Sequence, residues 1–241
     1  MPAYNWNWSV LVSQPYLGWL LDGLATTVML ALSAWMIALA LGTLIGVART
    51  LPNPLLRRLA TAYVDLFRNI PVLVQMFLWF FVLPEVVPRE MGHWLKRDLP
   101  HPEFFSAMMC LGLYAASRVA EQVRSGITSV PPGLAAAALA SGLSLAQTYR
   151  YVLLPLGFRI IVPPLTSEFL GIFKNTSIAL TIGVMEITAA SRQIESYTFQ
   201  GYEAFAAATA LYLSISLVLL FLTRRLEARA RIPGWIARGN T

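Results

Sequence analysis

Charge and cysteine are scarce in this chain of 241 residues. Only 12% of the residues are charged and 57% are hydrophobic, whereas soluble domains are about one quarter charged. This balance excludes an ordinary water-soluble domain. The single Cys110 has no second thiol with which to form an intrachain disulfide or a CxxC metal site. The sequence also has no Gly-Lys pair, which excludes a phosphate-binding P-loop.

Positive charge is in excess, but its arrangement does not suit nucleic acid. The net charge is +6, and 16 of the 18 basic residues are arginine. Most of these flank or interrupt apolar runs instead of forming one basic stripe. A membrane therefore explains the charge better, and we expect lipid and not nucleic acid as a partner.

Long apolar runs are what the sequence has in abundance. A helix that crosses a bilayer needs about 20 mainly apolar residues. We therefore expect an all-α integral membrane protein, with residues 1–241 forming a single domain. Five spans are predicted: 24–48, 59–83, 104–123, 160–182 and 204–223. We expect the first span to be retained, because residues 1–23 contain no Lys or Arg to form the positive region of a signal peptide.

The distribution of arginine predicts the orientation of the chain. Cytoplasmic flanks of membrane helices collect Lys and Arg. The N-terminal flank has neither, whereas the C-terminal tail carries Arg224, Arg225, Arg229, Arg231 and Arg238. We therefore expect the N-terminus outside and the C-terminus in the cytoplasm, which requires an odd number of spans. Three basic residues in the loop 84–103, which would lie outside, run against this trend.

The stretch 125–149 is also free of charge, but its composition argues against a sixth span. Pro132 can start a helix, and Gly142 suits the left-handed turn that ends one. Ser144 and Gln147 have the spacing of a capping box, and Pro155 should limit the helix that follows. The pattern predicts two short cytoplasmic helices joined at an elbow.

Two interpretations of this elbow are open on composition alone. Its small residues would let another surface approach closely, and Tyr149, Arg150 and Tyr151 provide larger anchors, as in helices that sit in a partner's groove. Alternatively, the segment is an interfacial hairpin that only connects two spans.

The spacing in the elbow, residues 130–155, resembles the EAA loop of bacterial ABC-importer permeases. That loop has Glu-Ala-Ala, a Gly six residues after the Glu, and Ile-x-Leu-Pro beginning ten residues after the Gly. The matching residues here are Ala137, Ala138, Gly142, Val152, Leu154 and Pro155. Ala136 stands where the family has Glu, so this resemblance implies docking to an ATPase by shape and apolar packing instead of an ion pair at that position.

Further matches extend the resemblance over most of the chain. The segments LFRNIPVLVQ (66–75), AEQVRSGI (120–127) and PPLTSEFLGIFKNTSIALTIG (163–183) resemble the polar amino-acid uptake branch of these permeases. With NWNW near the start and RYVLLP at 150–155, the whole chain is similar to the permease subunit of glutamate/aspartate importers.

The resemblance implies a five-helix type I permease core of the MetI-like kind in the bacterial inner membrane. It also implies a second permease subunit, most naturally a sister chain, two ATPase subunits and a periplasmic amino-acid-binding protein. The chain itself would be no enzyme and would bind no cofactor, because ATP and Mg would be used by the ATPase subunits.

Polar residues inside the predicted spans are candidates for a substrate pathway. An ionised side chain at mid-bilayer costs about 2.5–3.5 kcal/mol, so it needs a partner or a wet cavity. Lys174 could pair with an amino-acid carboxylate, and residues 174, 177, 178 and 181 would share one α-helical face. The candidate residues are Lys174, Asn175, Thr176, Ser177, Thr181, Glu168, Arg118 and Glu121.

Structural explanations compete with this pathway. Lys174 could simply neutralise Glu168, and Arg118 and Glu121, three residues apart, could satisfy each other. Asp65, Arg68 and Asn69 form another polar cluster that suits helix anchoring. His93 and His101 match no zinc-site spacing, so no metal site is expected.

We expect ATP-driven closure of the partner subunits to move the elbow as a lever and to alternate access around Lys174. Uptake of another polar amino acid is the nearest alternative. A secondary transporter is less favoured because no internal repeat is evident. An intramembrane protease is less favoured because both histidines lie outside the predicted spans.

Overall fold

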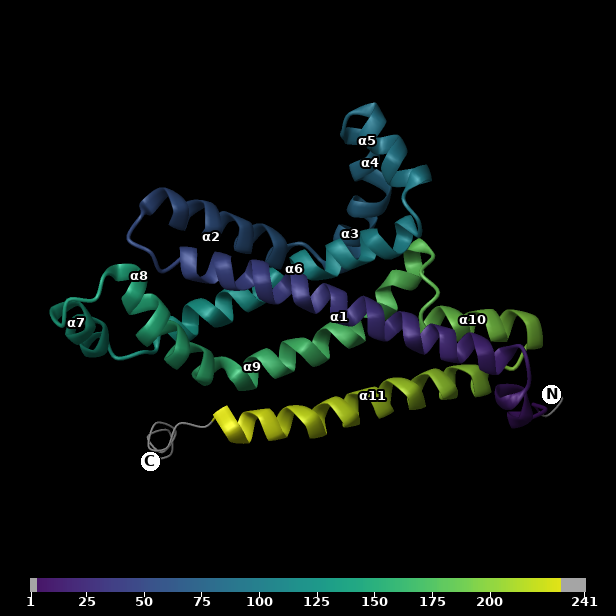
Figure 1. Ribbon diagram of the computed structural model, residues 1–241. Helices are drawn as coiled ribbons and strands as arrows, with labels where there is room; N and C mark the ends of the chain where they lie inside the picture. Colours follow the sequence, from purple (N-terminus) through teal and green to yellow (C-terminus); the bar gives the residue numbers. More distant parts are fainter. Residues whose placement is uncertain (1–3, 231–241) are drawn as a thin grey trace. The chain divides into compact units, whose positions relative to one another are not determined.

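The computed structural model describes residues 4–230, which are helical and contain no strand. Arg231 and Arg238, which entered the prediction of orientation, lie outside the described residues. The longer helices are α1 (Tyr16–Ala48), α2 (Pro54–Asn69), α6 (Pro102–Thr128), α9 (Leu154–Asn175), α10 (Ile187–Thr198) and α11 (Gly201–Ala230) (Figure 1). The shorter elements are η1 (Trp8–Val12), α3 (Val72–Phe77), η2 (Leu78–Val82), α4 (Leu83–Val86), α5 (Arg89–His93), η3 (Trp94–Asp98), α7 (Pro132–Ala140), α8 (Leu145–Thr148), η4 (Tyr149–Leu153) and η5 (Thr176–Ile182).

The chain divides into two compact units, each assembled from three separate segments. One unit comprises Met1–Met36, Ile70–Gly112 and Leu170–Leu219, and the other comprises Ile37–Asn69, Leu113–Phe169 and Leu220–Thr241. We call them the cavity unit and the elbow unit, after the features described below.

Three helices of the described chain are long and apolar enough to cross a membrane: Tyr16–Ala48, Leu145–Ile182 and Gly201–Arg225. A bent pair, Pro54–Asn69 with Val72–Val86, makes four if it counts as one span. Helix α6 covers the predicted span 104–123 but is not among the helices that meet the apolar criterion, because it carries charged residues in its second half.

The predicted span over residues 59–83 is not one continuous helix. Helix α2 ends at Asn69, and the chain bends before the helical segment that begins at Val72. The bend falls at Ile70 and Pro71, because a proline disfavours helical geometry in the residue before it and cannot donate a backbone hydrogen bond. Gln75 accommodates the bend by donating its side-chain amide to the Ile70 carbonyl at 2.9 Å.

Two glycines bring α1 and α6 into backbone contact within the elbow unit. A Cβ atom added at Gly42 would lie 2.7 Å from the Val119 Cβ, and one added at Gly46 would lie 2.6 Å from the Val123 Cβ. Real side chains do not fit at such distances. Gly42 and Gly46 form a Gly-xxx-Gly motif. Within lipid no hydrophobic driving force brings helices together, and such small residues let them pack closely.

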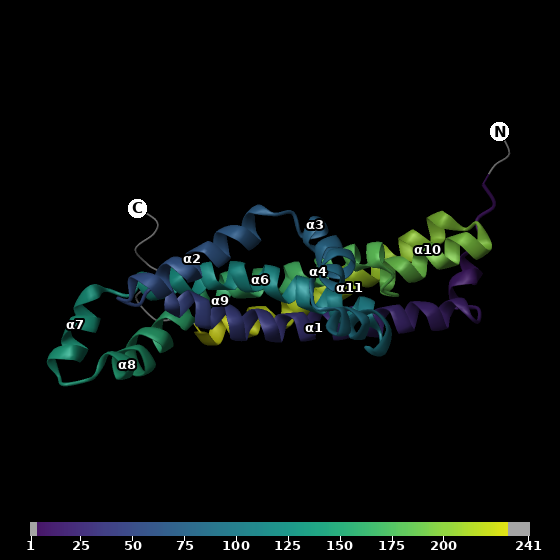
Figure 2. The same cartoon turned by 90° about the horizontal axis from the view of Figure 1, so that it is seen from above.

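The elbow has the predicted caps. Gly142 is left-handed, with φ +85°, and the Leu143 N–H reaches back to the Ala138 carbonyl at 3.2 Å, which closes a Schellman turn. Ser144 and Gln147 form the expected capping box. In both views α7 and α8 lie beyond the ends of the longer helices of their unit (Figure 1, Figure 2).

The second helix of the elbow does not end at Pro155, contrary to the prediction. It continues through the π-helical segment η4 directly into α9. The wider π turn pairs the Leu154 N–H with the Tyr149 carbonyl, five residues back. This local change of register before a residue that lacks an N–H lets the helix pass through proline.

The close contact of α1 with α6 predicts a specific sensitivity to substitution. We expect Gly46→Ala to lower the melting temperature of the detergent-solubilised protein, because overpacking costs about 1–3 kcal/mol. The matched control is Gly171→Ala in α9, where no atom lies within 4 Å of the new Cβ. Equal melting temperatures for the two variants, measured by tryptophan fluorescence, would contradict the close packing.

Candidate functional site

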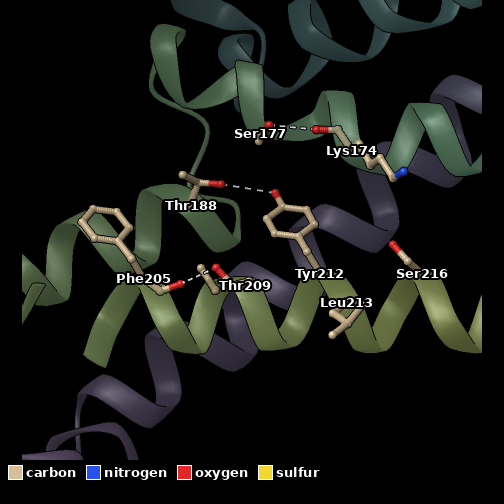
Figure 3. A pocket seen from close by; sticks show the side chains of 9 residues that line it. Lys174, Ser177, Thr188, Phe205, Thr209, Tyr212, Leu213 and Ser216 are labelled. Atoms are coloured by element: carbon tan, nitrogen blue, oxygen red, sulfur yellow. Dashed lines mark hydrogen bonds between the residues drawn. The ribbon is translucent and has the colours of Figure 1, made fainter. Parts of the chain in front are cut away.

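A cavity of about 530 Å³ lies in the cavity unit and brings part of the predicted pathway together. One face of α11 supplies most of its wall, with positions at the three- and four-residue intervals that share a helix face. The lining residues are Lys174, Ser177, Thr188, Phe205, Ala208, Thr209, Tyr212, Leu213 and Ser216 (Figure 3). The wall thus combines one ammonium group, five hydroxyl groups and apolar surface.

The predicted pathway residues in the cavity unit are only partly brought together. The α-helix ends at Asn175, and residues 176–182 form a 3₁₀ helix. Because a 3₁₀ helix has three residues per turn, the predicted α-helical face does not continue to Thr181. Lys174 and Ser177 line the cavity, but Thr181 is not among its lining residues.

The hydroxyl groups of this segment bond to their own helix. Thr176, Ser177 and Thr181 each donate to the carbonyl three residues earlier, at 2.7, 2.8 and 2.7 Å. Lys174 is exposed, and the ion pairs found within residues 4–230 do not include it. The ammonium group is therefore the strongest polar group that the cavity offers to a ligand.

A buried carboxylate behind the cavity escaped the sequence analysis. Glu186 is fully buried and caps the start of α10, where its side chain accepts hydrogen bonds from the backbone N–H groups of Ala189 at 2.9 Å and Thr188 at 3.0 Å. The phenol of Tyr212 donates to the same carboxylate. Since its proton points to Glu186, the Tyr212 oxygen can only accept hydrogen bonds from a ligand.

The signal for Glu186 in the sequence was weak. Glu is not a preferred N-cap residue, so no capping pattern marked it. The observation that could have found it is a single acidic residue between the apolar stretch before Gly183 and the Ala189–Ala190 pair.

Glu203, at the start of α11, is a second buried carboxylate that was missed. It accepts hydrogen bonds from the Tyr4 phenol at 2.5 Å and from the Asn7 N–H at 2.7 Å. These bonds hold the tryptophan-rich N-terminal segment on the end of α11, where the Trp6 and Trp8 rings stack with centroids 5.9 Å apart.

The predicted partners of Arg118 and Glu168 are wrong. Arg118 forms a two-point pair with Glu168, with Nε–Oε2 and Nη2–Oε1 distances of 2.6 and 2.9 Å. Arg118 does not form an ion pair with Glu121, and Glu168 does not form one with Lys174. A fork of two N–H groups fits both carboxylate oxygens of a neighbouring helix better than a group on the same helix.

Glu121 instead joins three elements of the elbow unit. Its carboxylate bonds to Arg124 at 2.5 and 3.2 Å and to the guanidinium of Arg49, at the end of α1. Arg68, of the predicted anchoring cluster on α2, lies 3.9 Å away. Arg118, Glu121 and Glu168 are therefore accounted for by structural ion pairs.

The residues of the EAA-like segment differ in their exposure. Ala136, Ala137, Arg150 and Pro155 are exposed, whereas Ala138 is buried. Three leucines, Leu134, Leu139 and Leu145, are 40–48% exposed. Tyr149 turns inward, and its hydroxyl donates to the Thr50 carbonyl at 3.0 Å.

His93 and His101 each lie near an acidic residue of their own loop. His93 lies 3.4 Å from Asp98, and His101 lies 3.6 Å from Glu103. Within the described part of the chain, no group of three or more His, Cys, Asp or Glu side chains could hold a metal ion.

The helices that are long and apolar enough to cross a membrane define a membrane protein, and the comparisons name its family. The chain belongs to the family described as "binding-protein-dependent transport system inner membrane component", which matches residues 38–232. The family describes an inner-membrane component, so the chain is an inner-membrane protein.

Particular relatives are similar over nearly the whole chain. The glutamate/aspartate import permease protein GltJ of Escherichia coli K12 is 44% identical, with 96% of this chain and 98% of the relative covered. The glutamine transport system permease protein GlnP of the same strain is 32% identical, with 95% and 99% covered. GltK, the glutamate/aspartate import permease protein of Escherichia coli O6:H1, is 32% identical, with 92% and 99% covered.

Solved structures agree on the fold. A crystal structure of an amino acid ABC transporter with histidines has a TM-score of 0.79 at 26% identity, with 94% of this chain and all of that chain covered. The MetNI methionine ABC transporter has a TM-score of 0.76 at 21% identity, which confirms the predicted all-helical, MetI-like fold.

The bonds to Glu186 predict that it is needed for stability. We expect Glu186→Ala to lower the melting temperature, because loss of an N-cap costs about 0.5–2 kcal/mol and leaves the Tyr212 hydroxyl without its acceptor. Glu90→Gln, at an exposed position of α5, serves as the control. A thermal scan in which the Glu186 variant melts with the wild type would disprove the role of this carboxylate.

Proposed function

We propose that this chain is a permease subunit of an ATP-binding-cassette importer for polar amino acids, in particular glutamate and aspartate. The observation that carries the proposal is the 44% identity to a glutamate/aspartate import permease over 96% of the chain. Import of another polar amino acid is the alternative, which the resemblance to a glutamine permease keeps in view.

The partners follow from the same proposal. Two ATPase subunits hydrolyse ATP with Mg, because this chain lacks the Gly-Lys pair of a P-loop. A periplasmic binding protein delivers the amino acid, and a sister permease completes the membrane core. The existence of two distinct glutamate/aspartate permease relatives, GltJ and GltK, supports a sister chain over an identical copy. The chain itself binds no cofactor.

The elbow is the proposed contact with the ATPase. Its exposed leucines and alanines form an apolar surface without a charge at Ala136, so docking depends on shape and packing. Gly142 sets the angle between the two short helices, because its φ of +85° is one that L-residues rarely adopt. Movement of the ATPase subunits then moves the elbow with its attached helices.

The cavity is the proposed passage for the substrate. A free amino acid carries a carboxylate and an ammonium group, and an acidic one carries a second carboxylate. Lys174 can bind a carboxylate, while the Tyr212 oxygen, polarised by Glu186, can accept from the ammonium group. The cavity thus has donors and acceptors for a zwitterion.

A substitution at Gly142 tests the proposed role of the elbow. We expect Gly142→Val to abolish most coupled uptake while leaving membrane insertion and basal ATP hydrolysis intact, because a β-branched residue is strained at positive φ. Gly133→Val, on α7 with no atom within 4 Å of its Cβ position, is the matched control. Normal uptake by the Gly142 variant in proteoliposomes would count against the elbow as a lever.

Substrate recognition can be tested in the reconstituted complex and with a substitution at Lys174. In the reconstituted complex, we expect glutamate or aspartate to raise ATP hydrolysis through the binding protein more than other amino acids do. Lys174→Gln should reduce uptake of acidic amino acids at least about tenfold, since a charged hydrogen bond contributes about 1.5–3 kcal/mol.

Lys96, the other lysine of the chain, provides the control, because it pairs with Glu85 on the outer loop. Lys96→Gln should leave uptake unchanged. An unchanged rate in the Lys174 variant would exclude its ammonium group from the pathway, and a preference for another amino acid across the panel would support the alternative substrate.

A further inference from the structure

A hydrogen bond inside the elbow unit fastens the elbow to the end of α1. The Tyr149 hydroxyl lies 3.0 Å from the Thr50 carbonyl, to which it donates, and 3.1 Å from the Thr50 hydroxyl. Thr50 is the second residue after the end of α1, and Tyr149 directly follows α8. The bond therefore joins two elements that are 99 residues apart in the sequence.

The end of α1 is in turn fixed to α6. Arg49, next to Thr50, is only 11% exposed, and its guanidinium bonds to the Glu121 carboxylate. A few residues earlier, Gly46 brings the two helices into backbone contact at Val123. A displacement applied to Thr50 is therefore passed to α1 and α6 as a pair, since packed helices move as rigid elements.

The covalent connection from the elbow to α9 departs from regular α-helical geometry. It runs through η4, where the Leu154 N–H bonds to the carbonyl five residues back, and then through Pro155, which has no N–H to donate. Such π segments are local departures from the regular helix, often at functional positions. The hydrogen bond from Tyr149 to Thr50 gives the elbow a second attachment, separate from this covalent one.

We propose that Tyr149 is a positioning residue for energy coupling, whose hydroxyl transmits movement of the elbow to the α1–α6 pair. This rests on the proposed function, in which an ATPase subunit holds the elbow. In this role Tyr149 faces its own chain, and the exposed residues of the elbow remain available to the partner.

The test compares Tyr149 with an exposed tyrosine outside the elbow. The complex of permeases, ATPase and binding protein is reconstituted in proteoliposomes, and glutamate uptake per ATP hydrolysed is measured. Tyr149→Phe removes one hydroxyl, so this ratio should fall about twofold to tenfold, the range that corresponds to one net hydrogen bond, while ATP hydrolysis continues. Tyr197→Phe removes the same atom from a side chain of α10 that is 67% exposed, and its ratio should equal that of the wild type.

The outcomes separate this proposal from the one on which it rests. Ser141→Cys, placed on the exposed turn of the elbow in a Cys110→Ala background, is cross-linked to the ATPase. Failure to cross-link in the otherwise unaltered complex contradicts the proposed function. The role of Tyr149 is overturned if the elbow cross-links with and without Tyr149→Phe and the uptake per ATP hydrolysed is unchanged in this variant. An equal fall of uptake and ATP hydrolysis in Tyr149→Phe overturns it as well.

A second variant covers the case in which Tyr149→Phe does not assemble. Arg49→Gln breaks the next link of the same connection and leaves Glu121 with its Arg124 partner. Its uptake per ATP hydrolysed should also fall, and a wild-type ratio in this variant contradicts the proposed connection.

Discussion

The close contact between α1 and α6 is the constraint on which the other contacts of the elbow unit depend. Only glycine fits at positions 42 and 46, because any side chain there would overlap α6. The contact brings Arg49 within reach of Glu121, and it presents the Thr50 carbonyl to Tyr149. An elbow attached to this pair at its base can move helices, whereas an elbow held only by its covalent connections could bend on its own.

Local features of the elbow could be predicted from the sequence, because caps and turns depend on neighbouring residues. Gly142 and the Ser144–Gln147 capping box needed no knowledge of the rest of the chain. The ion pairs could not be predicted in this way. Arg118 has an acidic residue at i+3, but its actual partner Glu168 lies on α9, and only the packing of the helices decides between the two.

Proline and buried acids account for the other differences. Pro71 breaks the second span whereas Pro155 does not end its helix, so the same residue type has opposite outcomes at the two positions. Glu186 was missed because its partners, the start of α10 and Tyr212, come together only in the folded unit. The bond between Tyr212 in the cavity wall and Glu186 is therefore a contact that no local pattern predicts.

The central claim is that the elbow lies in the cytoplasm, where an ATPase subunit can bind it, and is not a sixth membrane span. Labelling with a membrane-impermeant maleimide tests it most directly, with Ser141→Cys in a Cys110→Ala background and exposed Ser9→Cys as the outer-side control. The account predicts that intact spheroplasts label only position 9 and that inverted vesicles label position 141. Labelling of position 141 in intact spheroplasts would place the elbow outside and contradict the account.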